Sequence, residues 1–328
     1  MAEPSKQLIK LAQRLFADEG DRAAFIHALT TPPAFAPTIL WTRPKPPAFD
    51  WPTLPPLSWQ PDFIDRLAVD VRPGQHPLHD QGYFYSLDFS SVLAVAALQA
   101  IPAAPELAID LCAAPGGKSL FTWVALQPQR LICNEVVRKR VKILIANLKR
   151  CGAMGAIVLS QDPAVLAEHL PQCAQVVLVD APCSGQSLLA KGRSVPGCFH
   201  KVTVGRNASR QKRILANAAQ LVQPGGYLLY STCTYAPEEN EQVGAWFLKH
   251  FAEFSPVSVD CLQAYQSPLT ALPCYRLWPQ SGLGAGAFAM LWQRSPDGQG
   301  NPPDEAFLAA HQFTLYATGK SDPMGSAE

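Results

Sequence analysis

The sequence predicts an α/β protein built around a mostly parallel sheet with helices on both faces. From residue 76 onward, short apolar runs alternate with stretches of helical periodicity, which is typical of this class. The short runs are apolar at successive positions, as in strands that are buried on both sides. Hydrophobic residues make up 48% of the 328 residues, enough to bury a sizeable core.

The first 75 residues are expected to form a small lobe ahead of this sheet. An amphipathic helix is predicted over residues 5–17, because Leu8, Leu11 and Leu15 recur at helical spacing. Residues 32–61 then hold ten of the 31 prolines. Since proline is excluded from helix interiors and central strands, we expect an irregular or edge-like segment there. It either packs against the main domain, which we favour, or forms a binding surface.

The main domain is expected over residues 76–296, followed by a polar tail over 297–328. The clearest strands are predicted at 107–111, 130–134, 156–160, 175–180 and 227–231, with two further strands at 275–278 and 287–293. Helices are expected between them, at 117–127, 138–150, 207–222 and 238–251, and one more in the tail near 304–311.

Composition and segment lengths exclude several classes of protein. The first ten residues lack the apolar stretch of a signal peptide, and the run Val92–Leu98 is far shorter than a membrane span. Nine cysteines without C-x-x-C spacing argue against a disulfide framework and a zinc site. His76 and His79 have too few companions to suggest a metal. A cytoplasmic protein without a metal and without a membrane segment is therefore predicted.

A glycine-containing loop follows the first predicted strand of the main domain. It begins at Asp110 and ends in Gly116-Gly117-Lys118-Ser119, where a helix starts. Such a turn lets a ligand approach the backbone and the helix N-terminus. A phosphate-binding loop would need glycine at 112, which is Cys112, and the dinucleotide fingerprint is absent as well.

One acidic residue stands at or just after the end of each of the next three predicted strands: Glu135, Asp162 and Asp180. Ligands of open α/β sheets bind along the carboxyl ends of the strands, and a carboxylate about 20 residues after such a loop can accept from ribose hydroxyls. Taken singly, Glu135 and Asp162 could instead be helix caps or solvated turn residues. Two cysteines, Cys183 and Cys233, also leave strand ends beside this edge.

Three long motifs occur in this order: Cys112-Ala113-Ala114-Pro115-Gly116-Gly117-Lys118, Asp180-Ala181-Pro182-Cys183-Ser184-Gly185 and Tyr230-Ser231-Thr232-Cys233-Thr234. They resemble the hallmark motifs of the Nop/Sun (RsmB-like, NSUN) RNA cytosine-5 methyltransferases. The resemblance covers about residues 75–295. It also takes in Glu135 with Arg140, Asn147, Arg150 and Gly152, Gln211 with Leu215, Pro224-Gly225-Gly226 and Glu239-Asn240-Glu241.

The resemblance implies a Rossmann-like class I methyltransferase fold, with a seven-stranded, mostly parallel sheet behind a small α+β RNA-binding lobe. It implies S-adenosylmethionine as cofactor, held by Cys112, Ala113, Ala114, Pro115, Gly116, Gly117, Lys118, Glu135, Asp162 and Asp180. It makes Cys233 the nucleophile and gives Cys183 a part in product release. Asp180 would contact the target base or the cofactor, and Lys118 would orient Asp180.

These residue types suit the chemistry that the resemblance implies. Carbon 5 of cytosine is too poor a nucleophile to take a methyl group unaided, and addition of a thiolate to carbon 6 makes it enamine-like. A nearby carboxylate can stabilise charge on the ring during this addition. The sequence departs from the family pattern at Leu87, at Ala287 and in the loop 191–200, which leaves the choice of substrate open.

Basic residues gather in two segments beside these motifs. Thirteen of the 27 lysines and arginines lie within 138–150 and 191–213. Solvated helix faces are the alternative, but both clusters are candidate phosphate contacts. The predicted RNA contacts are Arg140, Lys191, Arg193, Arg206 and Arg210.

The sequence therefore predicts a monomeric RNA cytosine-5 methyltransferase whose substrate is ribosomal RNA, with a transfer RNA cytosine-5 methyltransferase as the alternative. A methyltransferase for exocyclic amino groups is one alternative, but its chemistry would not need Cys233. A non-catalytic RNA-binding assembly factor is another, and the intact Cys183, Cys233 and Lys118 argue against it.

Overall fold

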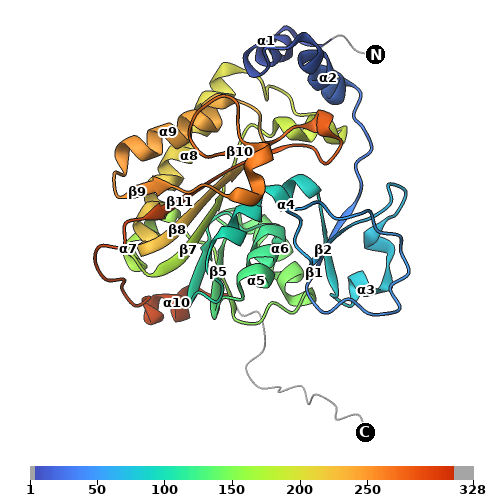
Figure 1. The fold of residues 1–328 in the computed structure, drawn as a ribbon. Coiled ribbons are helices and arrows are strands. Elements are labelled where there is room, and N and C mark those ends of the chain that lie inside the picture. The colour runs from blue at the N-terminus through green and yellow to red at the C-terminus, as the bar shows by residue number, and fades with distance from the viewer. Residues whose placement is uncertain (1–3, 314–328) are drawn as a thin grey trace.

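The computed structural model describes residues 4–313 and confirms the expected α/β architecture (Figure 1). Its main sheet has the order β10-β11-β8-β7-β4-β5-β6, with β9 paired to β11. Strands β4 to β8 are parallel to one another, whereas β11 runs antiparallel to β8, β9 and β10. The strands are β4 Leu107–Asp110, β5 Arg130–Asn134, β6 Ala156–Leu159, β7 Ala174–Asp180, β8 Val222–Thr232, β9 Phe254–Pro256, β10 Tyr275–Leu277 and β11 Ala287–Arg294.

All seven strands predicted from the sequence are present, and β9 is an eighth that was not predicted because it has only three residues. Strand β8 begins at Val222, five residues before the expected start. Its first half contains Pro224-Gly225-Gly226, which in a sequence indicates a turn. The structure accommodates these residues through an irregular register between β7 and β8, near Ala174 and Val176.

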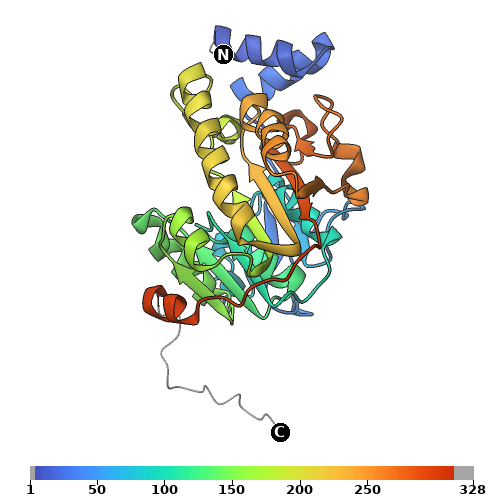
Figure 2. The same cartoon turned by 90° about the vertical axis from the view of Figure 1, so that its left-hand side faces the viewer.

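Two hydrophobic cores lie on opposite faces of the sheet. Strand β4 shows the alternation directly, because Ala108 points into one core and Leu107 and Ile109 into the other. One face carries α4 Phe89–Ala96, α5 Gly117–Leu126 and α6 Arg138–Arg150. The other carries α7 Pro163–His169, α8 Lys201–Leu221 and α9 Glu241–His250. Figure 2 shows α8, in yellow, as a long helix along its face of the sheet.

Two helices, α8 and α9, begin at residues that differ from the sequence-based expectation. Helix α8 begins six residues earlier than expected, where the His200 side chain accepts a hydrogen bond from the backbone N–H of Val202. Helix α9 begins three residues later, because Pro237–Glu239 form a separate 3-10 turn. Helices α4 and α7 were not predicted, since eight and seven residues are too few for a clear periodicity.

A second, three-stranded antiparallel sheet has the order β2-β1-β3, with β1 Thr38–Trp41, β2 Ile64–Arg66 and β3 Phe84–Leu87. The expectation that residues 32–61 contain no central strand is wrong for β1, which is the middle strand. Its four residues contain no proline and lie between Pro37 and Pro44, so each can join the ladder. Strand β3 leads directly into α4 of the main domain.

Aromatic side chains bind the small sheet and the Pro-rich segment to the rest of the molecule. Trp59 is buried in the core of the main domain, with its ring 5.0 Å from that of Phe89, and its indole N–H donates to Tyr265. Trp41 packs edge-on against Phe84 of β3. These contacts agree with a packing role for this segment.

The N-terminal helices α1 Lys6–Leu15 and α2 Glu19–Thr30 form a hairpin at the top of the molecule in Figure 1. Phe25 of α2 is buried against Tyr235, with ring centroids 4.9 Å apart. The hairpin thus supports the loop that follows β8. At the opposite end, α3 Pro77–Asp80 precedes β3, and α10 Glu305–His311 confirms the predicted tail helix. The rest of the predicted tail, 314–328, lies outside the described residues.

Within residues 4–313, no helix is long and apolar enough to cross a membrane. Across the same residues, no group of three or more His, Cys, Asp and Glu side chains is arranged to hold a metal ion.

Candidate active site

The candidate site lies at the carboxyl ends of three neighbouring strands, β8, β7 and β4. Asp110 is the last residue of β4, Asp180 the last of β7 and Thr232 the last of β8. Parallel strands end at the same edge of a sheet, so the loops that follow them are brought together there. This edge is where the sequence placed its candidate residues.

Lys118 and Asp180 meet across the ends of β4 and β7. The Lys118 Nζ lies 2.8 Å from Asp180 Oδ2, and both side chains are largely buried. The hydroxyl of Ser231, on β8, donates to the other oxygen of Asp180 at 2.9 Å. The carboxylate is therefore held from two sides, by Lys118 as expected and by Ser231, whose contact the sequence did not indicate.

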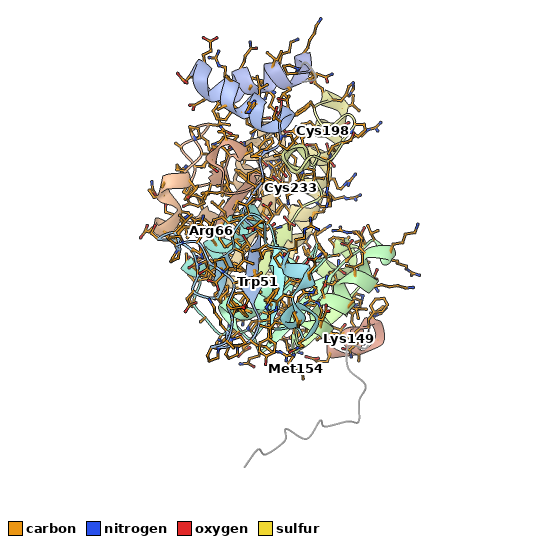
Figure 3. The ribbon with its side chains drawn as sticks, turned by 90° about the vertical axis from the view of Figure 1, so that its right-hand side faces the viewer. Trp51, Arg66, Lys149, Met154, Cys198 and Cys233 are labelled. Atoms are coloured by element: carbon orange, nitrogen blue, oxygen red, sulfur yellow. The ribbon has the colours of Figure 1, made fainter. Side chains whose placement is uncertain are left out.

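The two cysteines also meet. Their sulfur atoms lie 3.2 Å apart, and both thiols are free. Cys233 is exposed and Cys183 is half-buried. The hydrogen bond from Cys183, helped by the nearby Lys118 ammonium, lowers the pKa of Cys233. The same hydrogen bond, together with burial, raises the pKa of Cys183 well above its ordinary value. In Figure 3, Cys233 lies between the N-terminal hairpin above and Trp51 of the Pro-rich segment below.

The loop 111–116 connects β4 to α5 and approaches β3 closely. Gly116 has a φ of 114° and caps the helix, a conformation that side chains other than hydrogen rarely adopt. A Cβ at Gly117 would lie 2.9 Å from the Tyr85 ring of β3. The two glycines are thus explained by backbone conformation and by a close approach, and Tyr85 is a neighbour that the motif alone does not predict.

Asp110 anchors the start of this loop. It is buried, and it accepts hydrogen bonds from the Ser119 hydroxyl at 2.7 Å and from the Cys112 backbone N–H at 3.1 Å. Burial raises the pKa of Asp110 to about 7, despite these two hydrogen bonds.

Glu135 is buried at the end of β5 and tied to the loop through Arg140. One carboxylate oxygen accepts from the Val137 backbone N–H at 2.8 Å. The other lies 3.0 Å from the Arg140 guanidinium, and it has no hydrogen-bond partner among residues 4–313. Arg140 also donates to the carbonyl of Ala114. Arg140, predicted as an RNA contact, is thus an ion-pair partner of Glu135 here.

Asp162 follows β6 and caps α7, where its side chain accepts from the Ala164 backbone N–H at 2.9 Å. This is the capping role that the sequence left open as an alternative. Asn134 joins β5 to this region, since its amide group bonds both the N–H and the carbonyl of Gln161. Asp162 is exposed, so its capping role leaves one side accessible.

A cavity of about 350 Å³ lies between the loop, β3 and the segment after β7. Its wall on one side is the loop with Lys118 and Asp180. On the other side lie Tyr85 and Asp88 together with Lys191 and Arg193, two of the predicted RNA contacts. Lys191 is 3.2 Å from Asp88, which also caps α4. The remaining three do not line this cavity: Arg140 pairs with Glu135, and Arg206 and Arg210 are exposed on α8.

The chain is similar to known RNA methyltransferases. Residues 97–292 match the family model described as 16S rRNA methyltransferase RsmB/F. A ribosomal RNA small subunit methyltransferase F from Serratia proteamaculans is 31% identical over 245 residues, which are 73% of this chain and 51% of that protein. Its counterpart from Escherichia coli O7:K1 is 34% identical over 241 residues, 71% of this chain and 50% of that one. The chain thus spans about half the length of these relatives.

Solved structures confirm the methyltransferase fold. A methyltransferase homolog protein from Pyrococcus horikoshii superposes with a TM-score of 0.69 and 21% identity, over 88% of this chain and 99% of that one. NSun6 from the same organism, solved with SFG, gives a TM-score of 0.73 and 17% identity, over 89% and 99%.

Proposed function

We propose that this chain, which belongs to the 16S rRNA methyltransferase RsmB/F family, transfers a methyl group from S-adenosylmethionine to carbon 5 of a cytosine in RNA. The observation that carries the proposal is the cysteine pair, 3.2 Å apart beside the Lys118–Asp180 ion pair. Methylation of an exocyclic amino group would need neither thiol, and a non-catalytic assembly factor would not need a cysteine with a lowered pKa.

The residues present fit S-adenosylmethionine as the methyl donor. The cavity is bounded by the loop 112–118 and Asp180, and the buried oxygen of Glu135 lacks a hydrogen-bond partner among the described residues. We assign the loop, Glu135, Asp162 and Asp180 to the donor. When bound there, S-adenosylmethionine supplies an electrophilic methyl group for carbon 5.

The side chains of the site have separate roles in the reaction. The thiolate of Cys233 forms a bond to carbon 6 and so makes carbon 5 nucleophilic. Asp180, fixed by Lys118 and Ser231, accepts a hydrogen bond from the exocyclic amino group of the cytosine and so orients the ring for this addition. After methylation, water takes the carbon 5 proton, and the electron pair of that carbon–hydrogen bond re-forms the carbon 5–carbon 6 double bond. The carbon 6–sulfur bond then breaks with its electron pair on sulfur, which returns Cys233 as a thiolate. Cys183 lies 3.2 Å from that sulfur and assists this release.

We propose ribosomal RNA of the small subunit as substrate, in keeping with the names of the relatives, and transfer RNA as the second candidate. A target cytosine has to be unpaired or flipped out to reach Cys233. Lys191 and Arg193 at the cavity, and Arg206 and Arg210 on α8, supply positive charge for the phosphates. Arg140 would add to them through the part of its guanidinium that remains exposed.

The lobe over residues 1–75 is proposed as a further RNA-binding surface in front of the catalytic domain 76–296. We further propose that the protein acts as a monomer in the cytoplasm, without a metal.

Transfer of a labelled methyl group from S-adenosylmethionine tests the proposal directly. Small-subunit ribosomal RNA and transfer RNA are offered separately, and bisulfite sequencing then locates the modified base. We expect a single cytosine in ribosomal RNA to be methylated, and Cys233→Ala to abolish the label. Label on an exocyclic amino group, or undiminished label with Cys233→Ala, would overturn the proposal.

A further inference from the structure

A buried carboxylate, Glu239, lies directly behind Cys183. It has no measurable exposure, and its Oε2 accepts from the Ser184 backbone N–H at 2.9 Å and from the Gln211 side-chain amide at 3.0 Å. The same Gln211 nitrogen donates to the carbonyl of Pro182 at 3.0 Å. Both neighbours of Cys183 in the chain are therefore held by this Gln211–Glu239 pair.

Burial of the Gln211–Glu239 pair is unfavourable for folding, so a purely structural role does not explain it. Within residues 4–313, no cationic side chain forms an ion pair with Glu239, and its Oε1 has no hydrogen-bond partner. The Oε1 of Gln211 is likewise buried without a partner in that range. A buried carboxylate without an ion-pair partner is unfavourable for folding, so its presence next to a reactive group points to a function.

The cysteine pair needs such a residue. Two thiols 3.2 Å apart are chemically identical, and one proton between them can sit on either sulfur. The hydrogen bond between the sulfurs and burial disfavour a thiolate on Cys183, and the negative charge of Glu239 adds to this effect. The same hydrogen bond and the Lys118 ammonium favour a thiolate on Cys233, against the negative charge of Asp180. The two N–H donors at Oε2 favour the ionised form of Glu239, although burial raises its pKa.

We propose that Glu239, held by Gln211, is a positioning residue that orients the Cys183 loop and keeps the shared proton on Cys183, so that Cys233 is the thiolate. This inference rests on one part of the proposed function, namely that Cys233 is the nucleophile. It adds a residue whose charge contributes to the difference between the two sulfurs.

The variant Glu239→Gln removes the negative charge of the side chain while keeping its size and shape. The amide oxygen can keep the bonds to Ser184 and Gln211, while the amide nitrogen takes the place of the unpartnered Oε1. The folded, full-length variant is treated with less than one equivalent of iodoacetamide, without RNA or cofactor. Mass spectrometry then gives the label on Cys183 and Cys233, each relative to the exposed Cys261.

We expect the wild-type protein to be labelled mainly on Cys233. In Glu239→Gln the ratio of Cys183 to Cys233 label should rise about five- to tenfold, since one pKa unit corresponds to a tenfold change in thiolate. Glu238→Gln is the matched control, because Glu238 carries the same charge on the next residue but pairs with Arg14 at the surface. It should leave the ratio unchanged.

Two further variants separate charge from loop disorder. Gln211→Met and Glu239→Asp both retain the negative charge, so the preference for Cys233 should stay within about twofold of wild type, well under one pKa unit. An unchanged ratio in Glu239→Gln, or a lost preference in either charge-retaining variant, overturns the role of Glu239. If Glu239→Gln does not fold, Glu239→Asp decides alone. Wild-type labelling mainly on Cys183 would instead contradict the proposed nucleophile.

Discussion

The side-chain hydroxyl oxygens of Ser184 and Thr234 lie 2.7 Å apart, so the residues that follow the two cysteines are bonded to each other. Both are buried, and each belongs to the loop after its strand. Asp180 and Ser231 are partners in the ladder of β7 and β8, which sets the register of these loops. The distance between the sulfurs therefore follows from the register of two neighbouring parallel strands.

The two cysteines are expected to fail in different ways when replaced. Cys233→Ala removes the covalent step and should lose methyl transfer while still binding S-adenosylmethionine. Cys183→Ala should form the RNA adduct and stall there, which a denaturing gel shows as a slowly migrating protein–RNA band. The double variant is the control and should give no band. A band from Cys233→Ala would reverse the two roles.

Glu135→Ala is expected to weaken the binding of S-adenosylmethionine by about 1–3 kcal/mol, the usual loss when hydrogen-bonding partners are removed. It also leaves Arg140 without its carboxylate partner beside the loop. Calorimetric titration measures the change. Glu168→Ala, at an exposed carboxylate on α7, should bind normally. Equal affinity for both variants would count against Glu135 as a cofactor residue.

Replacing Arg206 and Arg210 with alanine is expected to reduce the salt dependence of RNA binding. Each lost phosphate contact lowers the slope of log affinity against log salt by roughly one unit, so the change should be about one to two units. The slope comes from filter binding over a range of salt concentrations. Lys249→Ala removes an exposed charge from α9 and serves as the control. A slope equal to that of the control would place the two arginines away from the RNA.

Asp110 should make stability fall as the pH rises. Its pKa is about 7 in the folded protein, against an ordinary value of 3.8, so the folded state binds the proton more tightly than the unfolded chain. The stabilisation is complete below about pH 4 and is lost as the pH rises towards 7, by up to about 4 kcal/mol. Asp110→Asn lacks this contribution.

Thermal unfolding from pH 5 to 8 checks this prediction. The stability of Asp110→Asn relative to wild type should increase up to about pH 7 and then level off. Its amide can still accept from Cys112 and donate to the Ser119 oxygen, which keeps both contacts of the carboxylate. Parallel stability curves for the two proteins would show that Asp110 does not titrate in this range.

Arg276→Met is expected to destabilise the fold by about 3–5 kcal/mol, because it leaves the buried Glu241 without its partner. The Arg276 guanidinium forms two hydrogen bonds of 2.6 Å with Glu241 and also donates to the carbonyl of Tyr235. Denaturant unfolding measures the loss. Adding Glu241→Gln should recover part of it, since no buried charge then remains. Equal losses in the single and double variants would mean that the charge is not the cause.

The sequence predicts the main sheet well because its strands are apolar on both faces. It does not reveal β9, α4 or α7, which are too short for a periodicity to stand out. It misjudges the proline-rich segment, where four residues free of proline suffice for a central strand. Whether a strand or helix can be predicted thus depends on its own hydrophobic pattern and on its length.

The site likewise contains residues that the sequence can place and residues that it cannot. Lys118, Asp180 and the two cysteines can be placed together from the sequence, because each follows a strand of one parallel sheet. Tyr85 and Asp88 cannot, since they reach the cavity from the other sheet and carry no motif that points there. The contacts of Gln211 and Glu239 with the Cys183 loop depend on how α8 and the 3-10 turn after β8 pack, which no spacing encodes.

The pairing of β3 with β1 has a consequence for the cavity of the candidate site. Strand β3 is an edge of the small sheet and, through Tyr85, also a wall of the cavity. At Gly117 that wall leaves no room even for a methyl group. The position of the small sheet therefore fixes how much room there is beside Gly117. The width of the cavity therefore depends on the position of the small sheet as well as on the main sheet.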